Sequence, residues 1–154
     1  MEIMDFLTEG AINLNLESKD KEGVLKELVD LLHQSGKIKD KKTLVKVLRG
    51  REELGSTGIG QGVAIPHGKS DQVSSICASF GLSKEGIPFD ALDGEPVHIF
   101  FLLVAPEGKA ADHLKALARI SSLIKDKFFR KMLQGAKSVE EIVTVIQREE
   151  KARY

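Results

Sequence analysis

A glycine-rich stretch that ends on a histidine, from Gly55 to Lys69, constrains the fold of this chain more than any other segment. Its sequence is Gly-Ser-Thr-Gly-Ile-Gly-Gln-Gly-Val-Ala-Ile-Pro-His-Gly-Lys. The glycines allow positive φ and a close approach of the backbone to a ligand or partner. Residues 63–65 are typical of a short buried strand, and Pro66 is expected to end it because proline has no amide donor. The pattern therefore predicts that His67 lies at a strand end, where a large partner can reach it.

Strand-like and helix-like segments alternate along the rest of the chain. We expect further strands at 12–16, 76–82 and 97–104, and helices at about 20–35, 40–53, 112–124, 126–135 and 138–147. The run 97–104 is apolar throughout, which is typical of a central strand buried on both faces. The helix at 112–124 is expected to turn Leu114 and Leu117 inward, and the charged tail after Arg148 is expected to fray. The alternation predicts an α/β fold: a single domain over residues 1–154, with a central sheet flanked by helices on both faces in a three-layer α/β/α arrangement.

Composition excludes several classes of protein. The formal net charge is +0, so no overall field draws the chain to nucleic acid or to anionic lipid. The longest apolar run, 99–105, is far shorter than the roughly 20 residues of a membrane span. One cysteine fits a reducing compartment, and the acidic N-terminus lacks the basic region of a signal peptide. We expect a cytoplasmic protein that does not insert into the membrane.

Several common chemistries lack their motifs in this sequence. No glycine-rich run ends in Gly-Lys-Ser/Thr ahead of a helix, so a P-loop is absent. Gly58–Gly62 precedes a strand rather than a helix, which excludes the dinucleotide fingerprint. There is no Gly-x-Ser-x-Gly elbow and no paired-cysteine spacing, and four scattered histidines do not make a metal site. We therefore predict neither a metal nor a cofactor.

The residues that remain suit phosphoryl transfer through a phosphohistidine. Neutral imidazole is nucleophilic near pH 7, which makes His67 the candidate nucleophile. Arg51 precedes the glycine-rich stretch, and His113 falls in the first turn of a helix, where free amides favour anions. Arg51 and a protonated His113 could hold the phosphoryl oxygens, with help from loop amides and from the hydroxyls of Ser56 and Thr57.

Plainer interpretations exist for most of these side chains. Arg51 can form a solvated Arg–Glu pair, and His113 can be a surface histidine. We expect His33 to be a surface residue without a chemical role and His98 to be a structural histidine. Cys77 is expected to be a small buried hydrophobic residue rather than a nucleophile.

The stretch that ends at His67 resembles the phosphohistidine motif of enzyme IIA, type 2, of the bacterial phosphoenolpyruvate-dependent phosphotransferase system. This is the fructose and mannitol class, which includes the nitrogen-regulatory enzyme IIA. Other segments match in the same order, and the close similarity runs from about Arg51 to Asp126. The matching segments are Arg51–Glu53, Phe89–Val97, Leu103–Pro106 and His113–Arg119.

The resemblance implies a phosphotransferase. The phosphocarrier protein HPr would phosphorylate His67, which would pass the group to a cysteine of a membrane-associated, fructose-class enzyme IIB during sugar transport. His113 and Arg51 match the family's supporting histidine and arginine, and Ser56 and Thr57 match its hydroxyl positions. No cofactor or metal is implied, and the family fold is a mixed sheet between helices.

The alternative is a regulatory enzyme IIA of the nitrogen-regulatory type. Such relatives accept phosphate on the same histidine and act by binding other proteins in one phosphorylation state. A phosphoryl group adds roughly −1.5 to −2 charges, which is enough to change the surface that a partner meets. Both interpretations need the same site, so they stay open at this stage.

The mechanism requires two histidines that are distant in sequence to meet in the fold. We expect the imidazoles of His67 and His113 to lie within about a side-chain length of each other, in a shallow exposed depression. The helix that carries His113 would aim its free amides at the phosphoryl group. Ile59 and Leu114 would form an apolar rim on which HPr docks.

Overall fold

The computed structural model describes residues 1–154 and contains six strands, five α-helices and one 3-10 turn. The elements are, in chain order, η1 (Ile3–Asp5), β1 (Leu7–Asn13), α1 (Lys21–Gln34), α2 (Lys41–Glu53), β2 (Gly58–Gly60), β3 (Val63–Ala64), β4 (His67–Lys69), β5 (Cys77–Ile87), β6 (Val97–Ala105), α3 (Ala110–Ile124), α4 (Lys127–Gly135) and α5 (Val139–Arg153).

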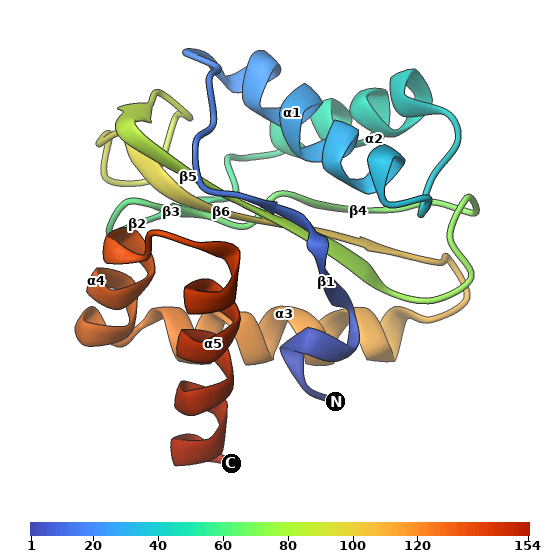
Figure 1. Ribbon diagram of the computed structural model, residues 1–154. Helices are drawn as coiled ribbons and strands as arrows, with labels where there is room; N and C mark the ends of the chain where they lie inside the picture. Colours follow the sequence, from blue (N-terminus) through green and yellow to red (C-terminus); the bar gives the residue numbers. More distant parts are fainter.

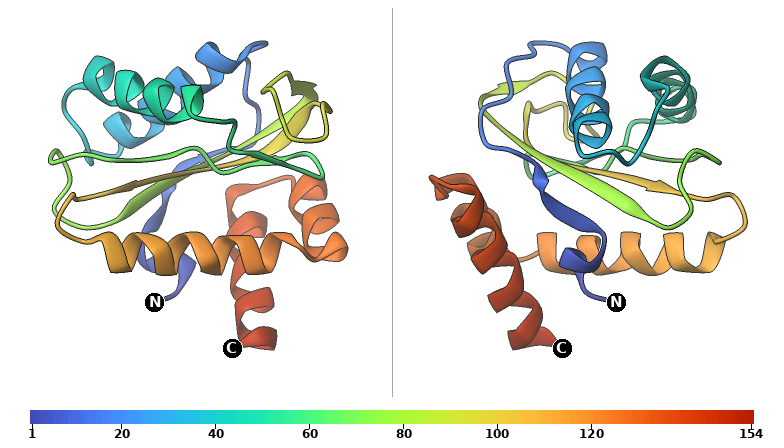
Figure 2. Two further views of the ribbon diagram at one scale, coloured as in Figure 1. Left: turned by 180° about the vertical axis from the view of Figure 1, so that it is seen from behind. Right: turned by 45° about the vertical axis from the view of Figure 1, so that its right-hand side comes forward.

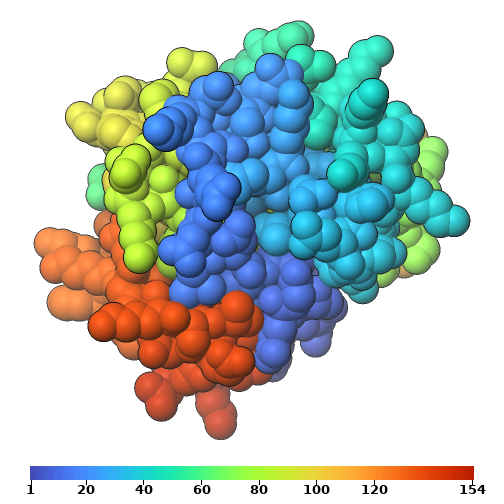
Figure 3. Space-filling view, turned by 45° about the horizontal axis from the view of Figure 1, so that its top comes forward, coloured from blue at the N-terminus to red at the C-terminus, as the bar shows by residue number.

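The elements form three layers (Figure 1). The sheet is the middle layer, with α1 and α2 on one face and α3, α4 and α5 on the other. The space-filling view in Figure 3 shows α1 and α2 next to each other on this side of the molecule. This arrangement confirms the predicted α/β class. None of the helices is both long enough and apolar enough to cross a membrane.

The sheet is mixed, and β6 lies at its centre. Its strand order is β1-β5-β6-β3-β2, and β4 also pairs with β6. β5 runs antiparallel to β6, whereas β3 and β4 run parallel to it, one after the other along the same edge. Alternate side chains of β6 enter two separate cores, Ile99, Phe101 and Leu103 on one face and Phe100, Leu102 and Val104 on the other. The prediction of a central strand buried on both faces is confirmed.

Aspartate side chains cap the starts of α1 and α2. The side chain of Asp20 accepts a hydrogen bond from the amide of Gly23 at the start of α1, at 2.7 Å. Asp40 does the same for Thr43 at the start of α2, at 3.1 Å. Short polar side chains at these positions satisfy amides that the first helical turn leaves free. The end of α2 is thereby set just before the glycine-rich stretch, and α2 lies over β4 (Figure 2, left).

The first strand begins earlier than predicted. β1 spans Leu7–Asn13 rather than 12–16, because Leu7 pairs with Ala78 and Ile12 with Phe80, on either side of an irregularity in the register. Leu16 lies beyond the strand, although its amide still donates to the carbonyl of Leu82 at 2.9 Å. The irregularity lies between residues 7 and 12, ahead of the apolar alternation at 12–16 from which the strand was predicted, and only residues 12 and 13 of that segment belong to β1.

The charged C-terminal tail does not fray. α5 continues to Arg153, and Glu150 near its end is buried. The carboxylate of Glu150 accepts hydrogen bonds from the amide of Ile3 at 3.1 Å and from Nε of Arg119 at 2.7 Å. The last helix is therefore tied to the start of the chain and to α3.

Candidate active site

His67 is the first residue of β4, not the end of the preceding strand. Pro66 lacks an amide donor, but its carbonyl accepts a hydrogen bond from Leu103 at 2.9 Å, so the chain continues along β6. His67 itself pairs with Leu103 in the parallel register. The proline thus interrupts the edge strand without turning it away, and the histidine is carried by the sheet rather than by a loop.

The imidazole of His67 is fixed by its own backbone. Nδ1 lies 2.8 Å from the carbonyl oxygen of Ile65. A carbonyl oxygen can only accept, so Nδ1 carries the proton and Nε2 keeps its lone pair. The pKa of His67 is lower than the ordinary value of a histidine, mainly because the ring is buried, and the positive charge of Arg51 lowers it further. The ring is half-buried and neutral at pH 7, with Nε2 as its nucleophilic atom.

His113, on α3, lies next to this imidazole. The two ring centroids are 5.5 Å apart and the rings meet edge to face at 75°, so the predicted proximity of the two imidazoles is confirmed. His113 is only 6% exposed, and its Nε2 has no hydrogen-bond partner. Burial is the main reason that the pKa of His113 is lowered to about 4, and the proximity of the titratable His67 ring and of Lys69 lowers it further.

The inward face of α3 differs from the predicted one. His113, Ala116 and Ile120 are buried, whereas Leu114 is 67% exposed, so the interpretation of His113 as a surface residue is wrong. The helix starts at Ala110, and the amide of His113 already donates to the carbonyl of Lys109 at 3.1 Å. Residue 113 therefore faces His67 with its side chain and has no free amide to offer.

Arg51 ends up beside the site through the last turn of α2. Its Nη1 donates to the carbonyl of Gly55 at 2.9 Å, and its charge acts on the pKa of His67. The neighbouring Glu52 forms its ion pair with Lys21 at 3.1 Å rather than with Arg51. The alternative interpretation, a solvated pair of Arg51 with a glutamate, does not occur, because Arg51 forms no ion pair with any carboxylate.

The hydroxyls of Ser56 and Thr57 are both engaged within the protein. Ser56 donates to the carbonyl of Phe89 at 2.7 Å, and Thr57 donates to the carboxylate of Glu52. The amides of Thr57 and Gly58 are also bonded, to Glu52 at 3.1 Å and to Ser56 Oγ at 3.0 Å. These groups can contact a phosphoryl group only if they give up the hydrogen bonds that hold the loop. The amides of Thr57 and Gly58 are therefore not free to bind phosphoryl oxygens, as had been expected of loop amides.

Sequence reasoning missed the buried carboxylate of Glu52. No role of its own was expected for Glu52, but it is 8% exposed, accepts hydrogen bonds from Thr57 and forms an ion pair with Lys21. Glutamate is rarely buried unless it is paired, which made its burial unexpected. The signal that could have found it is helical spacing, because Glu52 follows Leu44 and Leu48 at intervals of four residues on the buried face of α2. Glu53 does not follow this spacing.

The other histidines and the cysteine occupy the expected environments. His33 is exposed. His98 donates from Nδ1 to the carbonyl of Ser83 at 2.9 Å, as a structural histidine does. Cys77 is buried, and burial raises the pKa of its thiol to about 11. No group of three or more His, Cys, Asp or Glu side chains is placed to hold a metal ion.

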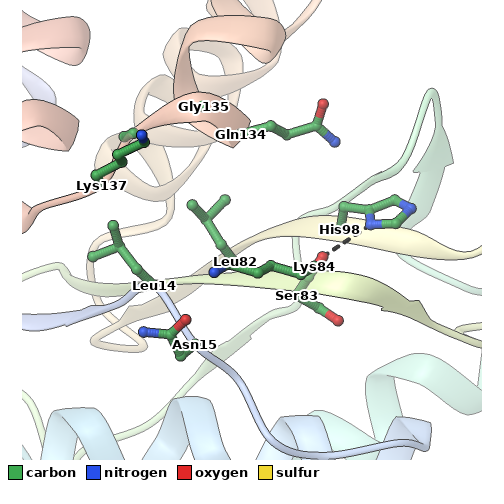
Figure 4. A pocket seen from close by; sticks show the side chains of 10 residues that line it. Leu14, Asn15, Leu82, Ser83, Lys84, His98, Gln134, Gly135 and Lys137 are labelled. Carbon is green, nitrogen blue, oxygen red and sulfur yellow. Dashed lines mark hydrogen bonds between the residues drawn. The ribbon is translucent and has the colours of Figure 1, made fainter.

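Two large pockets lie away from His67. One, of about 720 Å³, lies between the sheet and the turn from α4 to α5, with His98, Lys84 and Gln134 on its walls (Figure 4). The other, of about 780 Å³, lies between α1 and α2. Neither includes His67 or His113.

Fold and site together define a class: an α/β protein that presents a neutral, sheet-borne imidazole beside a second histidine and an arginine. The family model for the phosphoenolpyruvate-dependent sugar phosphotransferase system, EIIA 2, matches residues 5–149. The chain belongs to this family, as the sequence resemblance indicated.

Relatives of two kinds are similar to this chain. It is 41% identical over 151 residues to the PTS system fructose-specific EIIABC component of Bacillus subtilis, which covers 98% of the chain and 24% of that protein. It is 40% identical over 150 residues to a nitrogen regulatory protein of Bradyrhizobium diazoefficiens, with 95% of each covered. Among solved structures, the nitrogen regulatory protein IIA-Ntr of Neisseria meningitidis superposes with a TM-score of 0.88 at 34% identity, over 94% of this chain and 98% of the other. The chain spans about a quarter of the first relative and nearly all of the other two.

Proposed function

We propose that residues 1–154 form one enzyme IIA domain whose His67 carries a phosphoryl group. Nε2 of His67 attacks the phosphorus atom of phosphorylated HPr, the bond from phosphorus to HPr breaks, and its electron pair stays with HPr. In the onward step a cysteine thiolate of an enzyme IIB attacks the same phosphorus, and the electron pair of the N–P bond returns to Nε2. The observation that carries this proposal is the bond from Nδ1 to Ile65, because it leaves Nε2 as the nucleophile.

Arg51 and His113 are the groups that we assign to the phosphoryl oxygens. Transfer of a phosphoryl group depends mainly on positioning and charge stabilisation. Arg51 lies close enough to lower the pKa of His67. Nε2 of His113 is buried without a hydrogen-bond partner, next to the His67 ring. Ser56 and Thr57 remain candidate phosphate ligands, which would have to exchange their present bonds. No cofactor takes part in the proposed reaction.

The partner that reaches His67 is proposed to be a protein in the cytoplasm, rather than a nucleic acid. Leu114 and Ile59 are 67% and 43% exposed. Large apolar side chains that stay exposed are typical of docking surfaces when they gather at one place. We propose that they form the rim on which HPr and the enzyme IIB dock, without insertion of this chain into the membrane.

The destination of the phosphoryl group has two candidates. We propose transfer to a fructose-class enzyme IIB in sugar transport, which the similarity to the Bacillus subtilis protein supports. The alternative is regulation by phosphorylation-dependent protein binding, which the two nitrogen-regulatory relatives support. Adding a purified fructose-class enzyme IIB to the phosphorylated chain separates them. Rapid loss of label to the enzyme IIB favours transport, whereas retained label together with phosphorylation-dependent capture of another protein favours regulation.

Phosphorylation by the purified relay tests the shared step. The chain is incubated with phosphoenolpyruvate, enzyme I and HPr, and the acid-labile phosphate is mapped. We expect label on His67, no label in His67→Ala, and full label in the control His98→Ala. Label retained in His67→Ala would contradict the proposal.

A further inference from the structure

A buried carboxylate, Glu52, lies at the start of the glycine-rich stretch. One of its oxygens accepts from the amide of Thr57 at 3.1 Å, and the other accepts from the Thr57 hydroxyl. Nζ of Lys21 lies 3.1 Å from the first oxygen. A buried carboxylate is strongly unfavourable unless its charge and lone pairs are matched, and these donors match them.

From Glu52 a series of hydrogen bonds leads to the imidazole of His67. Glu52 holds Thr57 by both its amide and its hydroxyl. The carbonyl of Thr57 accepts from the amide of Ile65 at 3.0 Å, and the carbonyl of Ile65 accepts from Nδ1 of His67 at 2.8 Å. Each bond fixes the group that makes the next one, so the position of the Glu52 carboxylate is transmitted to the ring through two backbone carbonyls.

The far side of Glu52 is anchored by the start of α1. Nζ of Lys21 lies over the ring of Phe89, 4.8 Å from its centroid, and 3.6 Å from the carboxylate of Asp90. The carbonyl of Phe89 in turn accepts from the hydroxyl of Ser56. The glycine-rich stretch is thus held between the end of α2, the start of α1 and the segment that contains Phe89.

We propose that Glu52 is a positioning residue for His67. By holding Thr57, it keeps the carbonyl of Ile65 where it accepts the Nδ1 proton, so that Nε2 faces the phosphoryl donor. The proposal rests on the proposed function of His67 for its effect on transfer, but its effect on the ring can be measured without any phosphate. Glu52 does not touch the phosphoryl group in this account.

The test compares Glu52→Gln with Glu53→Gln, a neighbour of the same type whose side chain is exposed. A glutamine side chain has nearly the same volume as glutamate, but it lacks the charge that pairs with Lys21 and one of the two acceptor oxygens. Nitrogen-15 NMR of the His67 ring reports the share of molecules with the proton on Nδ1. We expect that share to fall in Glu52→Gln. We also expect kcat for transfer from phosphorylated HPr to fall roughly tenfold or more, with KM little changed. A displacement of the reacting group by about 1 Å can lower a rate ~100-fold.

A second pair of variants covers the case in which Glu52→Gln does not fold. Thr57→Val removes the hydroxyl that Glu52 accepts, whereas Thr57→Ser keeps it. We expect Thr57→Val to change the His67 ring signals in the same direction as Glu52→Gln, and Thr57→Ser to keep the ring signals of the wild type. A purely structural role would lower the melting temperature without moving the ring signals of the folded protein.

Two results bear on the two claims separately. Unchanged His67 ring signals and an unchanged rate in folded Glu52→Gln, or in Thr57→Val if the first variant is unfolded, would overturn the positioning role. A ring that responds to Glu52→Gln in a protein that takes no phosphate on His67 would overturn the proposed function and leave the positioning role in place.

Discussion

The imidazole rings of His67 and His113 meet edge to face with centroids 5.5 Å apart, although 46 residues separate them in the sequence. Burial and mutual proximity both oppose a positive charge on either ring. The pKa of His67 is lowered and that of His113 falls to about 4, so the unphosphorylated pair is neutral at pH 7. A phosphoryl group on His67 would place negative charge next to His113 and would therefore favour the protonated, positively charged form of that ring.

Phosphorylation of His67 is therefore expected to raise the pKa of His113. A neighbouring anion favours imidazolium, and the unpartnered Nε2 of His113 can then donate to a phosphoryl oxygen. NMR titration of the ring with and without phosphate measures the change, and the exposed His33 is the internal control because it should not shift. An unchanged pKa for His113 on phosphorylation would show that it does not support the phosphoryl group.

His113 should also make the unphosphorylated protein less stable in mild acid. The unfolded chain binds a proton at His113 near pH 6.5, whereas the folded protein binds it only near pH 4. Between these values the unfolded state holds more protons, so the free energy of unfolding falls as the pH is lowered, by up to about 3 kcal/mol from this group. Chemical denaturation at pH 7 and pH 4.5 measures this difference.

His113→Leu is the matching variant for the acid measurement. It removes the proton-binding group and keeps an inward side chain, so most of the loss between pH 7 and pH 4.5 should disappear, and the smaller contribution from His67 should remain. The lowered pKa values of Asp40 and Asp126 act at lower pH, below the ordinary 3.8 of an aspartate. An equal acid loss in His113→Leu and in the wild type would contradict the assignment.

Arg51→Ala should slow phosphoryl transfer and leave the fold intact. Its guanidinium makes one hydrogen bond, to Gly55, and surface contacts of this kind add little stability. Loss of one preorganised charge contact to a transition state typically lowers the rate ~10²–10³-fold. Arg49→Ala is the control, because Arg49 lies in the same helix and pairs with Glu22. Equal transfer rates in the two variants, measured with purified HPr, would show that Arg51 has no special role.

The regular elements could be predicted because their patterns are local. A strand is indicated by the apolar run of β6, and two helix starts are indicated by the capping residues Asp20 and Asp40, each within a few consecutive residues. The motif around His67 was likewise visible in the sequence. In α3 the apolar residues lie on more than one face of the helix, so their spacing did not decide which face turns inward, and Leu114 rather than His113 was expected there.

The hydrogen bonds that hold the site could not be predicted for a related reason. Helical spacing puts Glu52 rather than Glu53 on the buried face of α2, but it does not say that Lys21, from the start of α1, pairs with the carboxylate there. The strand was expected to end at Pro66, and β3 does end before it, at Ala64, but the start of β4 at His67 was not predicted. The hydrogen bond from Leu103 to the Pro66 carbonyl comes from a strand more than 30 residues away. Long-range contacts of this kind decide what a single residue does.

Two glycines near the site should respond in opposite ways to substitution by alanine. A Cβ on Gly58 would come within 2.8 Å of Cβ and 2.9 Å of Cα of Ala91, so Gly58→Ala should destabilise the protein by roughly 1–3 kcal/mol and displace the loop. A Cβ on Gly50, in the exposed part of α2, would meet nothing within 4 Å. Gly50→Ala should therefore stabilise the protein by about 0.5–1 kcal/mol. Thermal unfolding of both variants checks the pair, and a stabilised Gly58→Ala would mean that the loop is not packed as described.

The most direct measurement is to identify which ring nitrogen of which histidine carries the phosphoryl group. The wild-type chain is labelled with nitrogen-15 in its histidines, phosphorylated with phosphoenolpyruvate, enzyme I and HPr, and examined by NMR for coupling of phosphorus to the ring nitrogens. Because Nδ1 of His67 donates to Ile65, we expect phosphate on Nε2 of His67 and no phosphate on the other three histidines. Phosphate on Nδ1 of His67, or on any other histidine, would contradict the account.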